Sequence, residues 1–237
     1  MKPRPSGRRQ SQTTIDGAFR PVFGTMAEHD PFALSLTPEL VLRAYAHGVF
    51  PMAEGADSED LFWVDPDRRG IIPLDGLKVS RSLRKRIRNS GFTVKVDTDF
   101  DQTIRACASV GSDRLETWIN EDIIAIYGTL FDEGFCHTVE VWDGDEMVGG
   151  LYGLAMGGAF FGESMFHSRT DASKIALVHL VERLNAGGYT LLDAQFITDH
   201  LRSLGAIEIS RVEYHQRLGE ALARKGDFSA IDRKQET

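Results

Sequence analysis

Three runs of alternating apolar residues in the second half of the chain constrain its fold more than any other feature. T-V-E-V-W at 138–142 and V-G-G-L-Y-G-L-A at 148–155 flank a D-G-D segment. An Asp-Gly pair between two alternating runs is a strong hairpin signal. A third run, A-F-F-G-E-S-M-F at 159–166, extends the hairpin. The sequence therefore predicts a three-stranded antiparallel meander.

A helix and a strand are predicted to follow the meander. Leu177, Leu180 and Leu184 recur at helical spacing after a capping pair at 170–171, and Gly187-Gly188 mark the end of that helix. Y-T-L-L-D-A-Q-F at 189–196 reads as a strand, and shorter helices are expected at 198–204 and 211–223. The order of meander, helix, strand and helix predicts an α+β fold.

The first half of the chain gives weaker signals. In order along the chain we expect a helix at 38–47, a loop-rich small sheet at 50–76, a helix at 80–89, a strand at 92–96, a helix near 98–108, a brief extended piece at 117–119 and a helix at 121–134.

The composition excludes several classes of protein. Cys107 and Cys136 are the only cysteines among 237 residues, which excludes a disulfide scaffold and favours a cytoplasmic location. No apolar run has the length of a membrane helix, so we expect no membrane association. The formal charge of −8 argues against binding nucleic acid through bulk charge. Residues 1–30 are basic and poor in apolar residues, and we expect a disordered tail there.

A local concentration of positive charge stands against that overall balance. On the helix predicted at 80–89, four cations recur at i, i+3, i+4 and i+7: Arg81, Arg84, Lys85 and Arg88. No acidic residue lies between 78 and 88. Such a face suits phosphate groups, although a run of charge is more commonly a solvated surface.

Three polar residues in apolar strands are candidates for chemistry. Asp193 and Gln195 lie two apart, so they share one face of their predicted strand. Glu163 lies between apolar residues in the third run. Buried polar groups need partners, so Asp193 and Gln195 either cap a loop or have a function. Glu163 either binds a substrate ammonium or pairs with a structural arginine. No Walker A loop, dinucleotide-binding glycine motif or zinc-protease motif is present.

Placed together, these segments resemble bacterial leucyl/phenylalanyl-tRNA–protein transferases over about residues 36 to 218. The matching blocks occur in one order: H-G-V-F-P-M at 47–52, S-R-S-L at 80–83, T-W-I at 117–119, V-E-V-W at 139–142, V-G-G-L-Y-G at 148–153, F-G-E-S-M-F at 161–166, A-S-K at 172–174, L-D-A-Q at 192–195 and D-H-x-x-S-L-G-A at 199–206.

The resemblance implies a fold and a reaction. It implies a small N-terminal domain, expected at 31–96, and a C-terminal domain of acetyltransferase-like (GNAT) architecture, expected at 97–237. Such enzymes move an aminoacyl group, leucyl or phenylalanyl and in some cases methionyl, from tRNA to proteins that begin with Arg or Lys. The product is marked for degradation by the N-end rule. The tRNA ester is itself the activated donor, so no cofactor or metal is expected, and we expect a monomer.

The resemblance also implies roles for individual residues. Asp193 and Gln195 match the proposed catalytic pair, in which Gln195 contacts the attacking amine. Trp118 matches the residue that stacks on the terminal adenosine, and Glu163 matches the acid beside the donor ammonium. An apolar pocket for the donor side chain is expected from Leu151, Phe160, Leu177, Leu180, Leu184 and Leu192. Three of these leucines also form a helical stripe of the kind that packs on a sheet.

Three other functions compete with this interpretation. An acetyl-CoA-dependent acyltransferase of the same fold would carry a pyrophosphate-binding loop, which this sequence lacks. A tRNA-end-binding module without catalytic activity would show no transfer. A transferase of the same family could prefer another donor or acceptor, and here His167-Ser168-Arg169 replaces the family's Ser-Arg after E-S-M-F.

Overall fold

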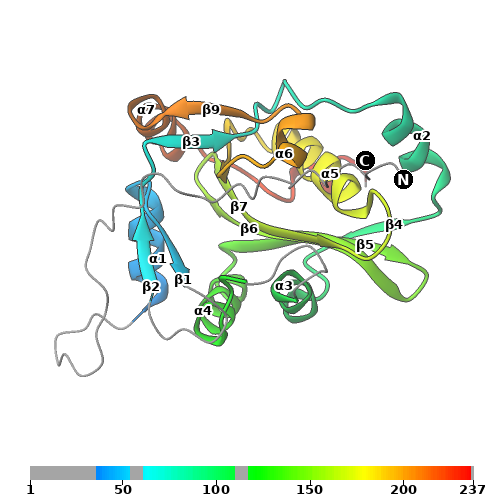
Figure 1. The fold of residues 1–237 in the computed structure, drawn as a ribbon, viewed down its shortest axis with the longest axis horizontal. Helices are drawn as coiled ribbons and strands as arrows, with labels where there is room; N and C mark the ends of the chain where they lie inside the picture. Colours follow the sequence, from blue (N-terminus) through cyan, green and yellow to red (C-terminus); the bar gives the residue numbers. More distant parts are fainter. Residues whose placement is uncertain (1–35, 54–60, 110–116, 236–237) are drawn as a thin grey trace, which may run out of the picture.

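A seven-stranded mixed sheet forms the centre of the computed structural model, which describes residues 36–53, 61–109 and 117–235 (Figure 1). The strand order is β4-β5-β6-β7-β8-β3-β9. Among these pairs only β7 and β8 are parallel. The strands are β3 (Arg68–Ile71), β4 (Thr93–Val96), β5 (Cys136–Asp143), β6 (Glu146–Met156), β7 (Ala159–His167), β8 (Leu191–Gln195) and β9 (Ile207–Ser210). A second sheet pairs β1 (Phe50–Ala53) with β2 (Leu61–Val64).

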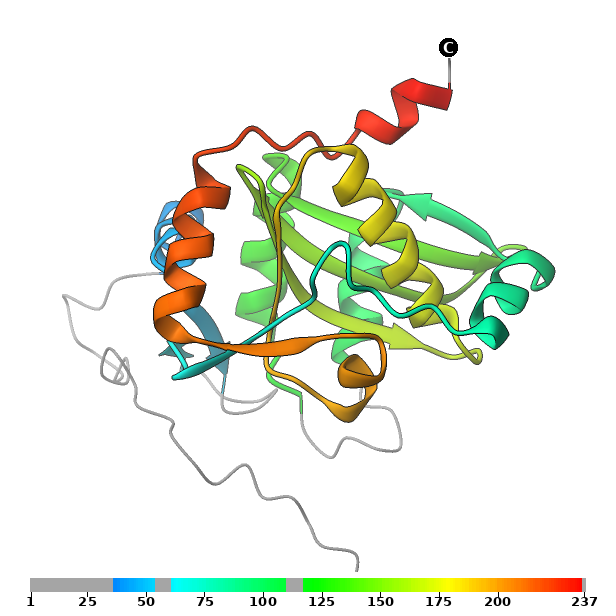
Figure 2. The same cartoon turned by 90° about the horizontal axis from the view of Figure 1, so that it is seen from above.

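Helices cover both faces of the large sheet (Figures 1 and 2). One core cluster packs under α1, α3, α4 and α7, and a second packs under α2 and α5. The helices are α1 (Pro38–Ala46), α2 (Arg81–Asn89), α3 (Phe100–Ala108), α4 (Glu121–Asp132), α5 (Ala172–Ala186), α6 (Asp199–Ser203), α7 (Arg211–Leu222) and α8 (Ala230–Gln235). The chain is therefore a mixed α/β protein.

The predicted meander and its helix are confirmed. Asp143 and Glu146 face each other across the β5–β6 turn, and Gly144 takes the positive φ of 62° that this tight turn requires. Helix α5 ends at Gly187, as expected. The predicted cap at 170–171 differs in one respect: Asp171 occupies the N-cap position, but its side chain makes no capping hydrogen bond. With φ at +66°, its carboxylate instead accepts from the Lys174 ammonium at 2.7 Å.

Two local predictions in the first half are wrong. The brief extended piece expected at 117–119 is interrupted by a bend at Trp118, before the Asn120 cap of α4. The small sheet at 50–76 contains β1 and β2, whereas β3 leaves it and inserts between β8 and β9 of the large sheet. The short strand β9 was not anticipated.

The expected division into parts 31–96 and 97–237 stays a prediction. Strands β3 and β4 both precede residue 97 and both pair within the large sheet, so that boundary would separate strands of one sheet. The disordered tail expected at 1–30 lies outside the described residues. Within the described ranges, no helix is both long and apolar enough to cross a membrane.

Candidate active site

Asp193 lies at the centre of a buried ion pair that the sequence did not reveal. Its carboxylate accepts from Arg69 Nη2 at 2.6 Å and from Arg69 Nε at 2.9 Å, and both side chains are 1% exposed or less. The Tyr214 hydroxyl donates to Asp193 Oδ2 at 2.8 Å. Burial opposes the charge on Arg69, but the adjacent Asp193 raises the pKa of this guanidinium above its ordinary value. The Asp193 carboxylate thereby accepts hydrogen bonds from two fixed side chains.

Further contacts fix Arg69 between the N-terminal segment and α7. Its Nη1 donates to the Gly48 carbonyl at 3.0 Å, and its guanidinium lies 4.4 Å from the ring centres of both Phe50 and Tyr214. Arg69 is on β3, which is antiparallel to β8. The strand inserted into the sheet therefore supplies the counter-ion of Asp193.

Gln195 combines an unusual backbone with an unpartnered amide. Its φ of 51° is in the left-handed region, and its backbone N–H donates to Asp193 Oδ1 at 2.9 Å. The side chain is 8% exposed, and Nε2 has no hydrogen-bond partner among the residues that the structure describes. Strained backbone of this kind is common at functional sites. A buried amide without a partner can form its hydrogen bond with a substrate.

Glu163 lies on β7 against two tyrosines rather than an arginine. The Tyr45 hydroxyl donates to Oε1 at 2.8 Å, and the Tyr127 hydroxyl donates to Oε2 at 3.3 Å. Burial raises the pKa of the Glu163 carboxyl to about 8; the Tyr45 hydrogen bond opposes this shift, and Asp193 reinforces it. The carboxyl is therefore mostly protonated at pH 7. A cation placed against it would favour the ionised form.

The parallel pairing of β7 and β8 ends where these groups lie. Its last paired positions are Phe161 and Asp193. Glu163 and Gln195 each follow by two residues, beyond the last paired positions. A carboxyl that is neutral at pH 7, an unpartnered amide and a carboxylate saturated by donors thus lie on neighbouring strands.

The other expected substrate-binding residues border two different core clusters. Trp118 is partly buried and packs against the cluster that contains Tyr45, Tyr127 and Tyr214, the tyrosines that contact Glu163 and Asp193. The second cluster, beneath α5, holds all six residues expected to line the apolar pocket: Leu151, Phe160, Leu177, Leu180, Leu184 and Leu192. These six side chains lie together and are buried. The structure brings them together as a packed core.

The basic face of α2 is exposed to solvent. The side chains of Arg81, Arg84, Lys85 and Arg88 are exposed, while Leu83 packs into the core. No ion pair to these four cations occurs within the described part of the chain. In Figure 2, α2 lies at the opposite end of the molecule from α1 and α7, which border the Asp193 ion pair. The face is open to a large anionic partner.

Four residues of this site were missed by the sequence analysis: Arg69, Tyr45, Tyr127 and Tyr214. Arg69 gave one weak signal, a charged residue directly before the apolar G-I-I segment at 70–72. The tyrosines gave none, because a tyrosine on an apolar helix face looks like an ordinary core residue. No group of three or more histidine, cysteine or acidic side chains is placed to hold a metal ion in the described ranges.

Comparison with known proteins relates most of the chain to one family. The profile described as leucyl/phenylalanyl-tRNA protein transferase matches residues 71–219, and the profile of that family's N-terminal domain matches 35–67. A leucyl/phenylalanyl-tRNA–protein transferase from Rhodospirillum rubrum is 59% identical over 83% of this chain and 92% of its own length. The chain belongs to the leucyl/phenylalanyl-tRNA–protein transferase family. Relatives of the same name from Afipia carboxidovorans and Cereibacter sphaeroides are 52% and 59% identical, over 87% and 82% of this chain and 91% and 89% of theirs.

Membership in the transferase family confirms the resemblance found in the sequence. One solved structure shows a distant likeness. A solved structure titled L-PGS, from Bacillus licheniformis, is 13% identical over 67% of this chain and 66% of that one, with a TM-score of 0.43. That likeness is too low to support an argument. Where this chain departs from the family pattern, the His167 ring lies 3.3 Å from the Ser173 hydroxyl, and Arg169 pairs with Glu146.

Proposed function

We propose that this transferase moves a leucyl or phenylalanyl group from the 3′ end of tRNA to the N-terminal amine of proteins that begin with Arg or Lys. Identity of 52–59% to relatives named for this activity supports the donor. The observation that carries the proposal is the unpartnered Gln195 amide beside the Asp193–Arg69 pair and the neutral Glu163 carboxyl. Methionyl-tRNA is an additional candidate donor.

The reaction needs positioning and proton transfer more than it needs activation. A neutral amine attacks the ester carbonyl, an amide bond forms, and the 3′ oxygen of the tRNA leaves with a proton. The ester already holds the free energy that drives this exchange. The site must align the amine, stabilise the oxyanion and move one proton.

Asp193 acts in this proposal as an orienting group. Its two oxygens already accept from Arg69, Tyr214 and the Gln195 backbone, so it has no free position for the amine proton. The same contacts fix the turn that carries Gln195. The Gln195 side chain then contacts the attacking amine through its oxygen or the developing oxyanion through Nε2.

Glu163 acts as the receptor for the donor's free α-ammonium. Arrival of that cation lowers the pKa of the carboxyl, so Glu163 releases its proton as the charge pair forms. Tyr45 and Tyr127 keep both carboxyl oxygens oriented during this change. Binding of the donor is thus coupled to the release of one proton from Glu163.

The remaining contacts bind three parts of the aminoacyl-tRNA: the terminal adenosine, the phosphates and the donor side chain. Trp118 stacks on the terminal adenosine, a use of aromatic faces common in single-stranded nucleic-acid binding. The exposed cations of α2 contact phosphates of the tRNA acceptor stem. The apolar cluster under α5 opens to take the donor side chain, and it favours an unbranched or aromatic group over a β-branched one.

Several broader features are part of the same proposal. The C-terminal part has GNAT-like architecture preceded by a small N-terminal domain, and the protein works as a monomer. Its products are substrates for N-end-rule degradation. Charged tRNAs and two buried thiols are both in keeping with the cytoplasm.

One transfer assay tests the proposed function. Leucyl-tRNA and a peptide with N-terminal Arg are incubated with the protein, and mass spectrometry should show a peptide one leucyl residue heavier. A peptide with an acetylated N-terminus is the matched control and should stay unchanged. Acetyl-CoA in place of leucyl-tRNA tests the rival acyltransferase. Binding of the tRNA without extension of the peptide would contradict the proposal.

A further inference from the structure

Phe228, in the segment after α7, belongs to the cluster proposed as the donor pocket. This segment follows the region matched by the family profile, which ends at residue 219. The Phe228 ring is buried in the same core cluster as Phe160 and Leu184. Its centre lies 5.6 Å from that of Phe160, with the planes only 12° apart. The two rings therefore form one stacked unit.

Phe160 is confined on its other side by the backbone of β6. A Cβ added at Gly153 would lie 2.4 Å from Phe160 Cε1, so the ring rests directly against a position that only glycine can occupy. Phe160 cannot move further toward that strand. Its stacking partner, Phe228, lies outside that strand.

The Phe228 backbone is tied to the helix that supplies three of the pocket leucines. Arg183 lies on α5 between Leu180 and Leu184, and its Nη1 donates to the Phe228 carbonyl at 2.7 Å. The same guanidinium binds both carboxylate oxygens of Asp232 at 2.6 Å. The segment is thus anchored by its main chain, while the Phe228 ring stacks with Phe160 and His137 and lies 5.2 Å from the Arg183 guanidinium.

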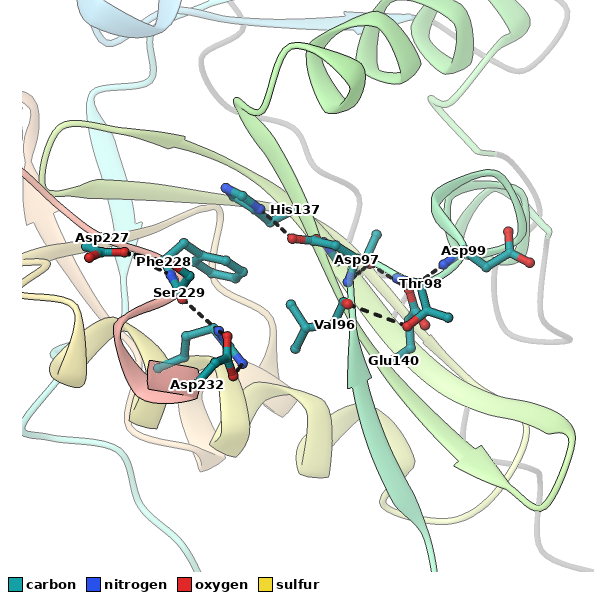
Figure 3. Close-up of polar contacts among 12 residues, drawn as sticks. Val96, Asp97, Thr98, Asp99, His137, Glu140, Asp227, Phe228, Ser229 and Asp232 are labelled. Atoms are coloured by element: carbon teal, nitrogen blue, oxygen red, sulfur yellow. Dashed lines mark hydrogen bonds and ion pairs between the residues drawn. The ribbon is translucent and has the colours of Figure 1, made fainter. Parts of the chain in front are cut away.

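A cavity of about 760 Å³ lies beside this ring, between β4, α5 and residues 225–232. Four of its lining residues are labelled in Figure 3: Val96, His137, Phe228 and Asp232. The His137 ring stacks with Phe228 at 4.0 Å, and Asp97 holds its Nδ1 at 2.8 Å. Because closely packed cores resist displacement, this adjoining space gives Phe228 room that Phe160 and the pocket leucines, which do not line it, lack.

We propose that Phe228 is the movable backing of the donor pocket, setting through Phe160 how large an aminoacyl side chain the enzyme accepts. The inference rests on the proposed function. A leucyl group fits with the two rings stacked in place, and a phenylalanyl group displaces both toward the cavity. Phe228 is a positioning residue, since it acts on the donor through Phe160.

Two substitutions that act in opposite directions test the inference. Phe228→Ala removes the backing and should raise kcat/KM for tryptophanyl-tRNA relative to leucyl-tRNA by about tenfold. Val96→Phe fills the cavity and should lower phenylalanyl transfer relative to leucyl transfer by a similar factor. Phe228→Leu keeps a bulky side chain and should restore most of the wild-type ratio.

A matched control separates selectivity from lost packing. Phe131→Ala removes a ring stacked on Phe100 at 4.8 Å in the other core cluster, and its donor ratios should equal those of the wild type. If Phe228→Ala does not fold, Val96→Phe decides alone. Unchanged donor ratios in the folded variants, with wild-type transfer intact, would overturn the inference. Absence of leucyl transfer by the wild type would instead overturn the proposed function.

Discussion

Replacement of Arg69 by Met should destabilise the protein severely, because it leaves the buried Asp193 carboxylate without its ion-pair partner. The variant removes a two-point ion pair between side chains that are 1% and 0% exposed. Loss of one partner of such a pair typically lowers the free energy of unfolding by about 3–5 kcal/mol. A domain of this kind is stable by only about 5–15 kcal/mol, so the variant is expected to be close to unfolding at 37 °C.

Urea unfolding followed by circular dichroism measures this loss. Arg217→Met, which breaks an exposed pair with Glu213, is the control and should change stability by about 1 kcal/mol or less. The double variant Arg69→Met, Asp193→Leu removes both charges and should be more stable than Arg69→Met alone. A loss below about 1 kcal/mol for Arg69→Met would refute the reasoning, because the pair would then contribute no more than an exposed ion pair does.

Three further predictions concern function and pH. Because the folded pKa of Glu163 is about 8, above its value of 4.5 in the unfolded chain, the folded state holds the extra proton between these values. Thermal stability should therefore fall as pH rises through that window, and Glu163→Gln should flatten the dependence. Gln195→Gly should keep or slightly raise stability, because glycine accepts φ of 51° without strain, yet it should lose most peptide transfer; wild-type transfer rates would contradict its role. The double variant Arg84→Ala, Arg88→Ala should reduce the slope of log K for tRNA binding against log salt concentration by about 0.9 for each lost phosphate contact, the value for duplex nucleic acid, with stability unchanged. An unchanged slope would mean that these arginines only solvate α2.

The local elements of the fold could be predicted because their signals are contained in short stretches. The Asp-Gly turn, the stripe of Leu177, Leu180 and Leu184, and the cap at Thr37 each depend on neighbours within a few positions. The position of β3 could not be predicted in this way. A four-residue strand carries no information about which distant strands it will join, and R-R-G-I is ambiguous by itself.

The candidate site was predicted in part for the same reason. Asp193, Gln195 and Glu163 drew attention as polar residues within apolar strands, and the structure supplies the partners of Asp193 and Glu163. Arg69 pairs with Asp193 across 124 positions, and Tyr45 reaches Glu163 across 118. No local pattern encodes such separations. The family resemblance supplied roles for residues but not these contacts.

The place of β3 in the sheet also governs the order in which the protein can fold. Residues 68–71 leave the ribosome early, yet their neighbours on both sides, β8 and β9, come from 191–195 and 207–210. Contacts over such long stretches form slowly, because the entropy of a large loop is lost before pairing begins. The Asp193 ion pair is therefore among the last features to form during synthesis. A nascent chain that stops before β9 leaves one edge of β3 open to pairing with other chains.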